Sequence, residues 1–377
     1  MTLIDVRSDA LEVICTGGDH MLGGKNWDEM TATWLAQQFS NEHGVPEERL
    51  TGDRETWQAL MSDAERIKFG LSTRESMPVK VQFEGGRSTV ELTRAKFDEL
   101  TRDLLERTVS LTKELLATAW SEGYSRVDLL LLVGGSTYMP QVMAAVKENF
   151  SCEMRQFDPN QAVGKGAALF GYKCFLDAQV RYRIAQKTGK TSHEVDAGAV
   201  PEDVRAAAEQ EVAKELGVGL PDIRKFTRRT VTTVTAKSFG IVVVDPASDE
   251  ERVCNLIKTN SALPTSICRQ FRTHFEDQEG VVLRCMENTE RVGPGDALLS
   301  LDTSTEVGST ELRFARALPK GSLLEVTFSL TEDGRLNVRG RDLTTHQEVD
   351  AEFRTTGILT LEEMEEHKRR NSRMVVS

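Results

Sequence analysis

The spacing of apolar residues changes once along the chain, and this change restricts the folds open to it. In the first half, apolar residues recur at helical spacing, as in 57–71, or form short continuous runs, as in 127–133. Such alternation of helices with buried strands is typical of an α/β domain. From Thr230 onward, β-branched residues and a period of two dominate, which is the pattern of strands in a β-sandwich. The sequence therefore predicts an α/β domain over 1–176 and an all-β domain over 230–356.

Two further segments differ from both domains in their sequence pattern. One lies between the domains, and the other is the C-terminal tail. Residues 177–229 are polar and contain one amphipathic stretch, 201–216, which Gly217 follows. Glycine at this place ends many helices, so we predict a partly helical connector or insertion. Residues 357–377 contain a charged stretch, 361–370, and are predicted to form a short, truncated helix and a tail. A chain of 377 residues is also too long for one ordinary core.

Local signals predict individual elements. Asp53 precedes the apolar residues of the helix at 57–71 and is its predicted N-cap. Thr93 is predicted to open one long helix. The run 127–133 is almost entirely aliphatic, so we predict a strand that is covered on both faces. Hairpins are predicted where turn residues separate short apolar segments, at 2–15, 79–92 and 324–339.

Composition argues against several classes of function. The formal net charge of -12 opposes binding to a polyanion, so no nucleic-acid partner is expected. No apolar run reaches the ~20 residues that cross a bilayer, so no membrane partner is expected. The cysteines form no C-x-x-C pair, and no histidine cluster accompanies them. We therefore predict no metal site, reduced thiols and a cytoplasmic location.

One predicted helix carries a polar face that could bind a ligand. Glu65, Lys68 and Ser72 follow one another at i, i+3 and i+7, so they share a face opposite the apolar stripe. A carboxylate, an ammonium and a hydroxyl in a row could hydrogen-bond the ribose and the purine edge of a nucleotide. The alternative is a solvated face with a single Glu–Lys pair, which stabilises a helix only slightly.

Two glycine turns precede predicted helices. Gly134, Gly135 and Ser136 follow the aliphatic run, and Gly23 and Gly24 stand at the start of another helical pattern. Glycine allows the backbone to approach a ligand, and a helix N-terminus offers unpaired N–H groups. The alternative is an ordinary turn, because neither segment is a complete phosphate-binding loop or a dinucleotide fingerprint.

Five blocks occur in an order that resembles the signatures of the seventy-kilodalton heat-shock (DnaK-type) chaperones. These blocks are 16–28, 64–72, 93–97, 132–140 and 158–163 with 166–168. Later stretches resemble the peptide-binding sandwich of the same family, and they are 319–321, 324–330 and 332–334. The resemblance covers nearly all of the chain except 177–229.

The resemblance implies a fold and a function. The fold would be α/β plus all-β, with a partial actin-like (ribonuclease H-like) ATPase domain followed by the peptide-binding β-sandwich. The function would be that of a molecular chaperone, with ATP-gated binding and release of extended apolar segments of unfolded proteins. The cofactors would be ATP and ADP, with Mg²⁺ in the complete family domain. J-domain and nucleotide-exchange co-chaperones would be its partners.

The resemblance also assigns side chains to the nucleotide. Glu65 and Lys68 would contact the ribose, and Ser72 would contact the adenine. Tyr138 stands where the family commonly has an arginine over the adenine, and its ring could stack on the base instead.

The glycine turns would complete this nucleotide site. Gly134, Gly135 and Ser136 would line the nucleoside and phosphate side. Gly23 and Gly24 would lie nearby, where close packing of the backbone is an alternative to contact with the ligand.

In the sandwich, the positions that resemble the family's peptide channel are Ile241, Val243, Phe271 and Val282. There, main-chain hydrogen bonds would hold an extended peptide and an aliphatic pocket would select its side chain. The alternative for each position is an inward residue of the sandwich core.

The chain departs from the family pattern at its start. Residues 1–4 align with the strand that follows the family's phosphate loop, so both phosphate loops, the catalytic lysine and the metal-facing aspartates are expected upstream. We therefore assign no catalytic residue and expect no ATP hydrolysis by this chain alone, since phosphoryl transfer depends on those groups. We also expect a fragment of a longer protein, with an uncovered apolar face where the family's other lobe packs.

Two further departures affect peptide binding. The family's short interdomain linker is not recognisable, and 177–229 stands in its place. The helical lid is missing after 364–370, so we predict weak peptide binding with fast exchange.

Two other interpretations stay open. The first is a non-catalytic peptide-binding or scaffold protein that needs no nucleotide. The second is another actin-like ATPase such as a sugar kinase, against which the β-rich region with Glu332-Asp333-Gly334 argues.

Overall fold

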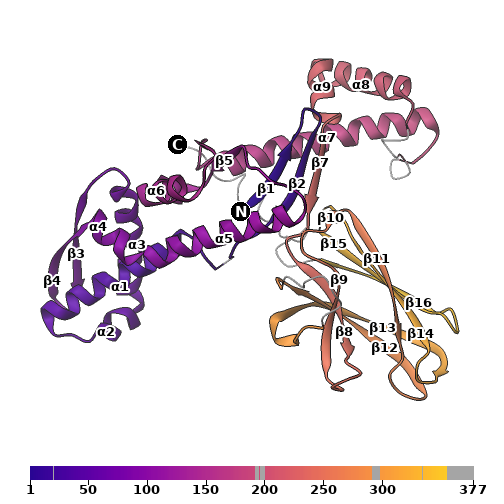
Figure 1. Cartoon of the computed structure of the whole chain (residues 1–377). Coiled ribbons are helices and arrows are strands. Elements are labelled where there is room, and N and C mark those ends of the chain that lie inside the picture. The colour runs from indigo at the N-terminus through magenta and orange to yellow at the C-terminus, as the bar shows by residue number, and fades with distance from the viewer. Residues whose placement is uncertain (20, 192–194, 196–199, 291–297, 333, 355–377) are drawn as a thin grey trace. The chain divides into compact units, whose positions relative to one another are not determined.

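The computed structural model describes residues 1–354 except 20, 192–194, 196–199, 291–297 and 333. They form two compact units, one of Met1–Leu3 with Gly17–Thr230 and the other of Ile4–Thr16 with the chain from Val231 onward. Figure 1 labels their helices and strands. Each unit has a hydrophobic core of its own. The predicted tail at 357–377 lies outside the described residues.

The first unit begins with helices packed on a two-stranded hairpin. Apolar residues of α1 and α3 share a core with the inward residues of both strands, among them Phe39, Ile67 and Val79. The elements of this layer are α1 (Gly24–His43), α2 (Glu47–Gly52), α3 (Arg54–Leu71), β3 (Ser76–Phe83), β4 (Gly86–Thr93) and α4 (Arg94–Leu100). The apolar face of α3, with its i, i+3, i+4 spacing, thus faces the core as predicted.

Local chemistry sets the ends of these elements. The Asp53 carboxylate accepts a hydrogen bond from the Thr56 backbone N–H at 2.9 Å, which confirms it as the N-cap of α3. Glu84 and Gly85 both have positive φ, 47° and 83°, as a two-residue hairpin turn requires. The hairpin predicted at 79–92 is therefore confirmed, with longer strands.

The prediction of one long helix after Thr93 is wrong in one respect, because the structure contains two helices that are divided at Thr101. Here α4 ends and α5 (Arg102–Ser121) begins. The Thr101 hydroxyl is fully buried and donates to the Phe97 carbonyl at 2.8 Å, while the Gln141 amide donates to it at 3.0 Å. A side chain bonded to the preceding turn and to another helix competes with regular helix geometry.

The strand predicted at 127–133 was expected to be covered on both faces, but one of its faces is exposed. β5 (Leu129–Leu132) pairs in parallel with β6 (Glu153–Gln156) alone among the described strands. Its side chains alternate, so Leu129 and Leu131 are 40% and 50% exposed while Leu132 is buried. An exposed apolar face of the expected kind is therefore present on β5, and Val163 and Leu169 of α7 (Ala162–Thr188) are exposed as well.

The predicted connector is largely helical. α7 passes through the predicted boundary at residue 176 and packs against α8 (Glu202–Leu216) and α9 (Leu220–Thr227). These helices share a core of their own, which includes Leu176, Val212 and Ile223. Gly217 ends α8 with φ 65°, the left-handed conformation that glycine adopts easily. The predicted helix is confirmed, while the domain boundaries stay a prediction.

The second unit is a β-sandwich, as predicted. One sheet has the order β11-β14-β15-β16 and the other β13-β12-β8-β9, and Figure 1 shows both in colours from salmon red to yellow. Their strands are β8 (Ser238–Val244), β9 (Glu251–Ile257), β11 (Thr265–Arg272), β12 (Gln278–Asn288), β13 (Ser304–Leu318), β14 (Leu323–Leu330), β15 (Arg335–Asp342) and β16 (Glu348–Arg354). Inward residues of both sheets, such as Phe239, Leu283 and Phe328, form its core, as alternation requires.

A further sheet holds the start of the chain. The hairpin predicted at 2–15 is confirmed as β1 (Thr2–Val6) and β2 (Ala10–Thr16), and the sheet continues through β7 (Thr230–Val234) to β10 (Ala262–Leu263). The Asn260 side chain accepts a hydrogen bond from the Thr16 backbone N–H at 3.0 Å. Residues separated by the whole of the first unit in sequence are thus neighbours in this sheet.

Candidate functional site

Three segments that are far apart in sequence meet at the first residue of α1. A Cβ atom added to Gly24 would lie 2.9 Å from Ser136 Oγ and 3.2 Å from Lys68 Nζ. Glycine at this position therefore allows Lys68 of α3 and Ser136 of η1 (Gly135–Tyr138) to approach the backbone of α1. The structure thus brings these three predicted nucleotide residues together.

Lys68 is the centre of this cluster. Its ammonium donates to Asp28 Oδ2 at 2.6 Å and to the Gly24 carbonyl at 3.0 Å. An ammonium carries three N–H donors, so these two bonds leave one for a ligand. Lys68 thus lies in a fixed hydrogen-bonded position rather than in a solvated Glu–Lys pair.

Asp28 is a member of the cluster that sequence reasoning missed. Asp28 is 6% exposed, and its Oδ1 atom has no hydrogen-bond partner in the structure. Burial raises the pKa of its carboxyl above the ordinary value, and the neighbouring Lys68 ammonium opposes that rise. The available signal was helical spacing, since Asp28 stands four residues after Gly24 and shares its face.

The other two residues of the predicted polar face lie differently. Glu65 is exposed, and its charge is close enough to Asp28 to contribute to the raised pKa of that carboxyl. Ser72 is the C-cap of α3, and its hydroxyl donates to the Lys68 carbonyl at 3.2 Å. Glu65 is thus available to a ligand, whereas the Ser72 hydroxyl is engaged with its own helix.

The second glycine turn is held by the segment before α7. Gly134 has φ 90°, and its N–H donates to the Pro159 carbonyl at 2.8 Å. A Cβ at Gly135 would lie 3.4 Å from Asn160 Oδ1. Tyr138 closes the turn with 42% of its surface exposed, so its ring can stack on a planar ligand.

The first glycine turn divides its two residues between different roles. Gly23 is the N-cap of α1, and its N–H donates to the Asn26 side chain at 2.8 Å. A Cβ on Gly23 would meet nothing within 4 Å. Only Gly24 of the pair therefore contacts the Lys68 cluster.

The residues predicted to bind peptide do not all lie together. Ile241 is 3% exposed, and Val243 and Phe271 are half-buried against the same core. Val282 is 57% exposed and faces away from this core, towards which Val281 and Leu283 point. Three of the four residues thus pack on the same core. Successive side chains of a strand point to opposite faces, so Val281 lies on the core side of β12 and Val282 on the outer side.

Val282 instead lines a shallow hollow of about 560 Å³ on the outside of the sandwich. Phe314 and Arg313 of β13 contribute to it, at a place where β13 has extra residues opposite Gln278 and Gly280 of β12. Such bulges locally interrupt a ladder and turn side chains outwards.

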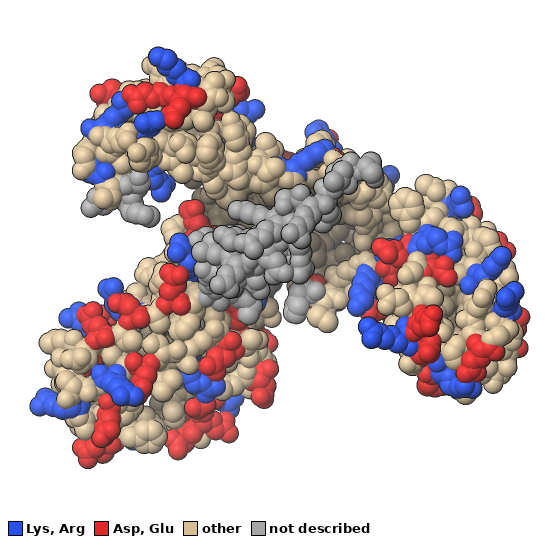
Figure 2. Space-filling model, turned by 180° about the vertical axis from the view of Figure 1, so that it is seen from behind, with Lys and Arg blue, Asp and Glu red and all other residues tan. Residues whose placement is uncertain are grey.

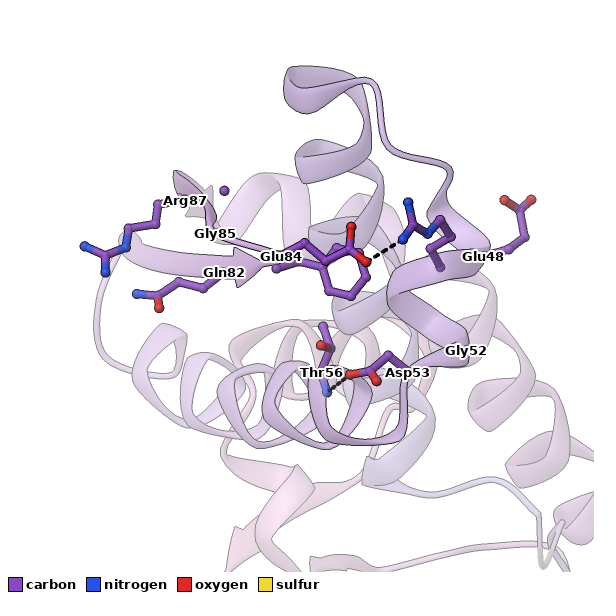
Figure 3. Close-up of a pocket in the computed structure, with 11 residues that line it drawn as sticks. Glu48, Gly52, Asp53, Thr56, Gln82, Glu84, Gly85 and Arg87 are labelled. Carbon is purple, nitrogen blue, oxygen red and sulfur yellow. Dashed lines mark hydrogen bonds and ion pairs between the residues drawn. The ribbon is translucent and has the colours of Figure 1, made fainter.

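A larger hollow, of about 730 Å³, contains none of the predicted residues (Figure 3). It lies between α2 and the β3–β4 turn, where Arg49 pairs with Glu84 and its guanidinium lies 5.9 Å from the centre of the Phe83 ring. Asp53 at its edge is already engaged as the α3 N-cap. Three of its charged side chains, Arg49, Glu84 and Asp53, therefore have structural partners.

Charge is distributed without a dominant sign on the surface seen in Figure 2, where basic and acidic side chains are interspersed. Among the described residues, no group of three or more His, Cys, Asp or Glu side chains could hold a metal ion. Among the same residues, no helix is both long and apolar enough to cross a membrane.

Comparison with known proteins finds similarity to one family. Residues 1–174 match the family model described as Hsp70 protein. The chaperone protein DnaK of Halobacterium salinarum is 32% identical over 340 residues, which are 88% of this chain and 43% of the relative. The chaperone protein DnaK of Mycoplasmoides gallisepticum is 29% identical over 359 residues, which are 92% of this chain and 49% of the relative. The chain thus spans about half the length of the curated relatives it matches.

Proposed function

The chain belongs to the Hsp70 family, and on this premise we propose that it works as a DnaK-type chaperone. Its first unit binds an adenine nucleotide, and its sandwich binds extended apolar segments of unfolded proteins. The observation that carries the proposal is the convergence of three separate parts of the first unit, because Lys68 Nζ and Ser136 Oγ both lie within 3.2 Å of the position that a Cβ atom on Gly24 would occupy.

In the first unit, the nucleoside is bound by groups from α3 and from the turn that contains η1. The remaining Lys68 N–H and the Glu65 carboxylate hydrogen-bond the ribose hydroxyls. Gly134, Gly135 and Ser136 lie along the nucleoside and phosphate side, and the exposed Tyr138 ring stacks on the adenine. ATP or ADP is the ligand class, and Mg²⁺ accompanies the phosphates as it does for nucleotides generally.

In the second unit, an extended peptide is recognised mainly through its backbone. Main-chain hydrogen bonds supply affinity, and apolar side chains near Val243 and Phe271 select aliphatic residues. Both residues are half-buried at the margin of the core, so they offer apolar surface without opening the sandwich. Co-chaperones of the J-domain and nucleotide-exchange classes are the partners that this function calls for.

Calorimetric titration of the full chain with ADP tests the nucleotide half of the proposal. Lys68→Ala should weaken binding at least about tenfold, because a charged hydrogen-bond donor is lost. Lys25→Ala is the matched control, since Lys25 is a lysine of α1 whose side chain is 79% exposed, and it should leave the affinity unchanged. Equal affinities for the native chain and the Lys68 variant would contradict the proposal.

A nucleotide-independent peptide-binding protein is the second candidate. It is favoured by the independent core of the sandwich, which shares no residue with the Lys68 cluster. Peptide binding that persists in a chain showing no heat with ADP would establish it. A sugar kinase is disfavoured by the β-sandwich and by the similarity to DnaK over 88% of the chain.

A further inference from the structure

The Asp28–Lys68 pair differs from the other lysine–carboxylate pairs near it. Its two side chains are only 17% and 9% exposed, and the charged atoms lie 2.6 Å apart. In the neighbouring pair on α1, Lys25 and Glu29 are 79% and 42% exposed and lie 3.6 Å apart. A pair shielded from water is weakly screened by salt and holds its geometry.

The pair joins two helices at the point where the ligand would sit. Asp28 stands in the second turn of α1, and Lys68 stands in the last turn of α3. The Gly24 carbonyl accepts a second hydrogen bond from Lys68, so α1 supplies both acceptors. These two acceptors fix the ammonium at Gly24, where the Ser136 hydroxyl also approaches the backbone of α1.

The pair also determines the charge that a ligand meets. The Asp28 carboxylate neutralises the Lys68 ammonium, and the nearby Glu65 adds a negative charge. The formal charges of the three groups sum to one negative charge. Such a cluster disfavours a phosphate and favours a neutral group that can both donate and accept hydrogen bonds.

We propose that Asp28 is a positioning residue that holds the Lys68 ammonium against α1 and cancels its charge, so that this corner of the site reads ribose hydroxyls and not phosphate. The inference rests on the proposed nucleotide function, which it deepens by adding Asp28 as the residue that positions the ribose-binding Lys68. Asp28 acts through Lys68 and does not itself touch the ligand.

The first test measures selectivity for ribose. Affinities for adenosine and 2′-deoxyadenosine are compared by calorimetry in the native chain and in Asp28→Asn. The native chain should prefer adenosine by about tenfold, the effect of one hydrogen bond to a charged group, and the variant should lose most of that preference. Asp63→Asn is the matched control, because Asp63 pairs with Arg66 on the outer part of α3, and it should keep the preference. An unchanged preference in Asp28→Asn would overturn the proposal.

The second test needs no nucleotide. Lysines are acetylated with limiting acetic anhydride, and modification of Lys68 and of the exposed Lys25 is quantified by peptide mass spectrometry. Removal of the Asp28 carboxylate frees the ammonium from its short hydrogen bond, so Lys68 should react several-fold faster in Asp28→Asn and at an unchanged rate in Asp63→Asn. A Lys68 rate that does not respond to Asp28→Asn would show that Asp28 does not hold it.

The two tests separate the inference from the proposed function. If the native chain binds no adenosine, the nucleotide proposal and the assignment of the ligand are contradicted. The acetylation result still decides whether Asp28 holds Lys68. If circular dichroism shows that Asp28→Asn does not fold, Asp28→Glu replaces it, since it keeps the charge and moves it by one methylene. Asp28→Glu should restore protection of Lys68 in part, and full reactivity in this variant would count against the proposal.

Discussion

At the scale of single residues, buried charge determines several features of this chain. Glu209 of α8 has no exposed side-chain surface, and it forms ion pairs with Arg205, Arg224 and Arg228. Burial disfavours its charged form, but hydrogen bonds from Arg228 and Arg224 outweigh burial and hold the pKa of Glu209 below its ordinary value. Arg228 is two residues before β7, so this cluster fixes the end of the helical connector.

Glu209→Gln tests that cluster. Removal of one partner of a buried ion pair should lower the free energy of unfolding of the connector by about 3 kcal/mol at neutral pH. Because the folded pKa is lowered, the stabilisation is present above the ordinary value of 4.5 and is lost as the pH falls below it. The difference between the two proteins should therefore shrink in acid, as measured by urea unfolding at several pH values. Glu211→Gln on the same helix, whose partner Lys187 is at the surface, should change little, and a difference that grew in acid would contradict the account.

Residue roles were predictable from sequence where one helix face carries them. The shared face of Glu65 and Lys68 followed from spacing alone, whereas the partner of Lys68 did not. Asp28 is 40 residues away, and only the packing of α1 on α3 brings it close. Sequence pattern likewise did not decide between Val281 and Val282, because both are apolar and a shift of one residue reverses the face of a strand.

At the scale of elements, turn and cap residues were predictable because their chemistry is local. Asp53 and the β3–β4 turn needed only their neighbours in sequence. The break at Thr101 was not predictable, since it depends on Gln141 from another helix. The cover over β5 was also not predictable, because an aliphatic run reads the same whether one face or both faces are packed.

Gly240 provides an element-scale prediction in the sandwich. It lies at the register shift between β8 and β9, and a Cβ there would be 2.3 Å from the Cys254 carbonyl oxygen. Because the obstacle is backbone, Gly240→Ala should destabilise the sandwich by about 3 kcal/mol. Gly164→Ala in α7 meets nothing within 4 Å and should not destabilise its unit, because alanine favours a helix more than glycine does.

Two spectroscopic signals make this prediction specific to the sandwich. All four tryptophans, Trp27, Trp34, Trp57 and Trp120, belong to the first unit. The transition seen by far-ultraviolet circular dichroism should therefore shift in Gly240→Ala, while the tryptophan fluorescence transition stays in place. A sandwich of unchanged stability would contradict the clash that the backbone geometry implies.

At the scale of the whole molecule, the change of periodicity near residue 230 predicted the two kinds of architecture. The division into units follows it except at the start of the chain, where Ile4–Thr16 joins the β-rich unit. This pairing was not predictable, because a β1–β2 hairpin can be recognised locally but its neighbour β7 is more than 200 residues away. Long-range strand pairing carries little local signal in a sequence.

Peptide binding tests the chaperone proposal most directly. Fluorescence anisotropy of the full chain would be measured with a labelled, leucine-rich heptapeptide and with the same peptide carrying aspartates at its central positions. The account predicts saturable binding of the apolar peptide, fast exchange on dilution, and at least about tenfold weaker binding of the acidic peptide, because an apolar pocket rejects a desolvated charge. Equal binding of both peptides, or no binding of either, would contradict it.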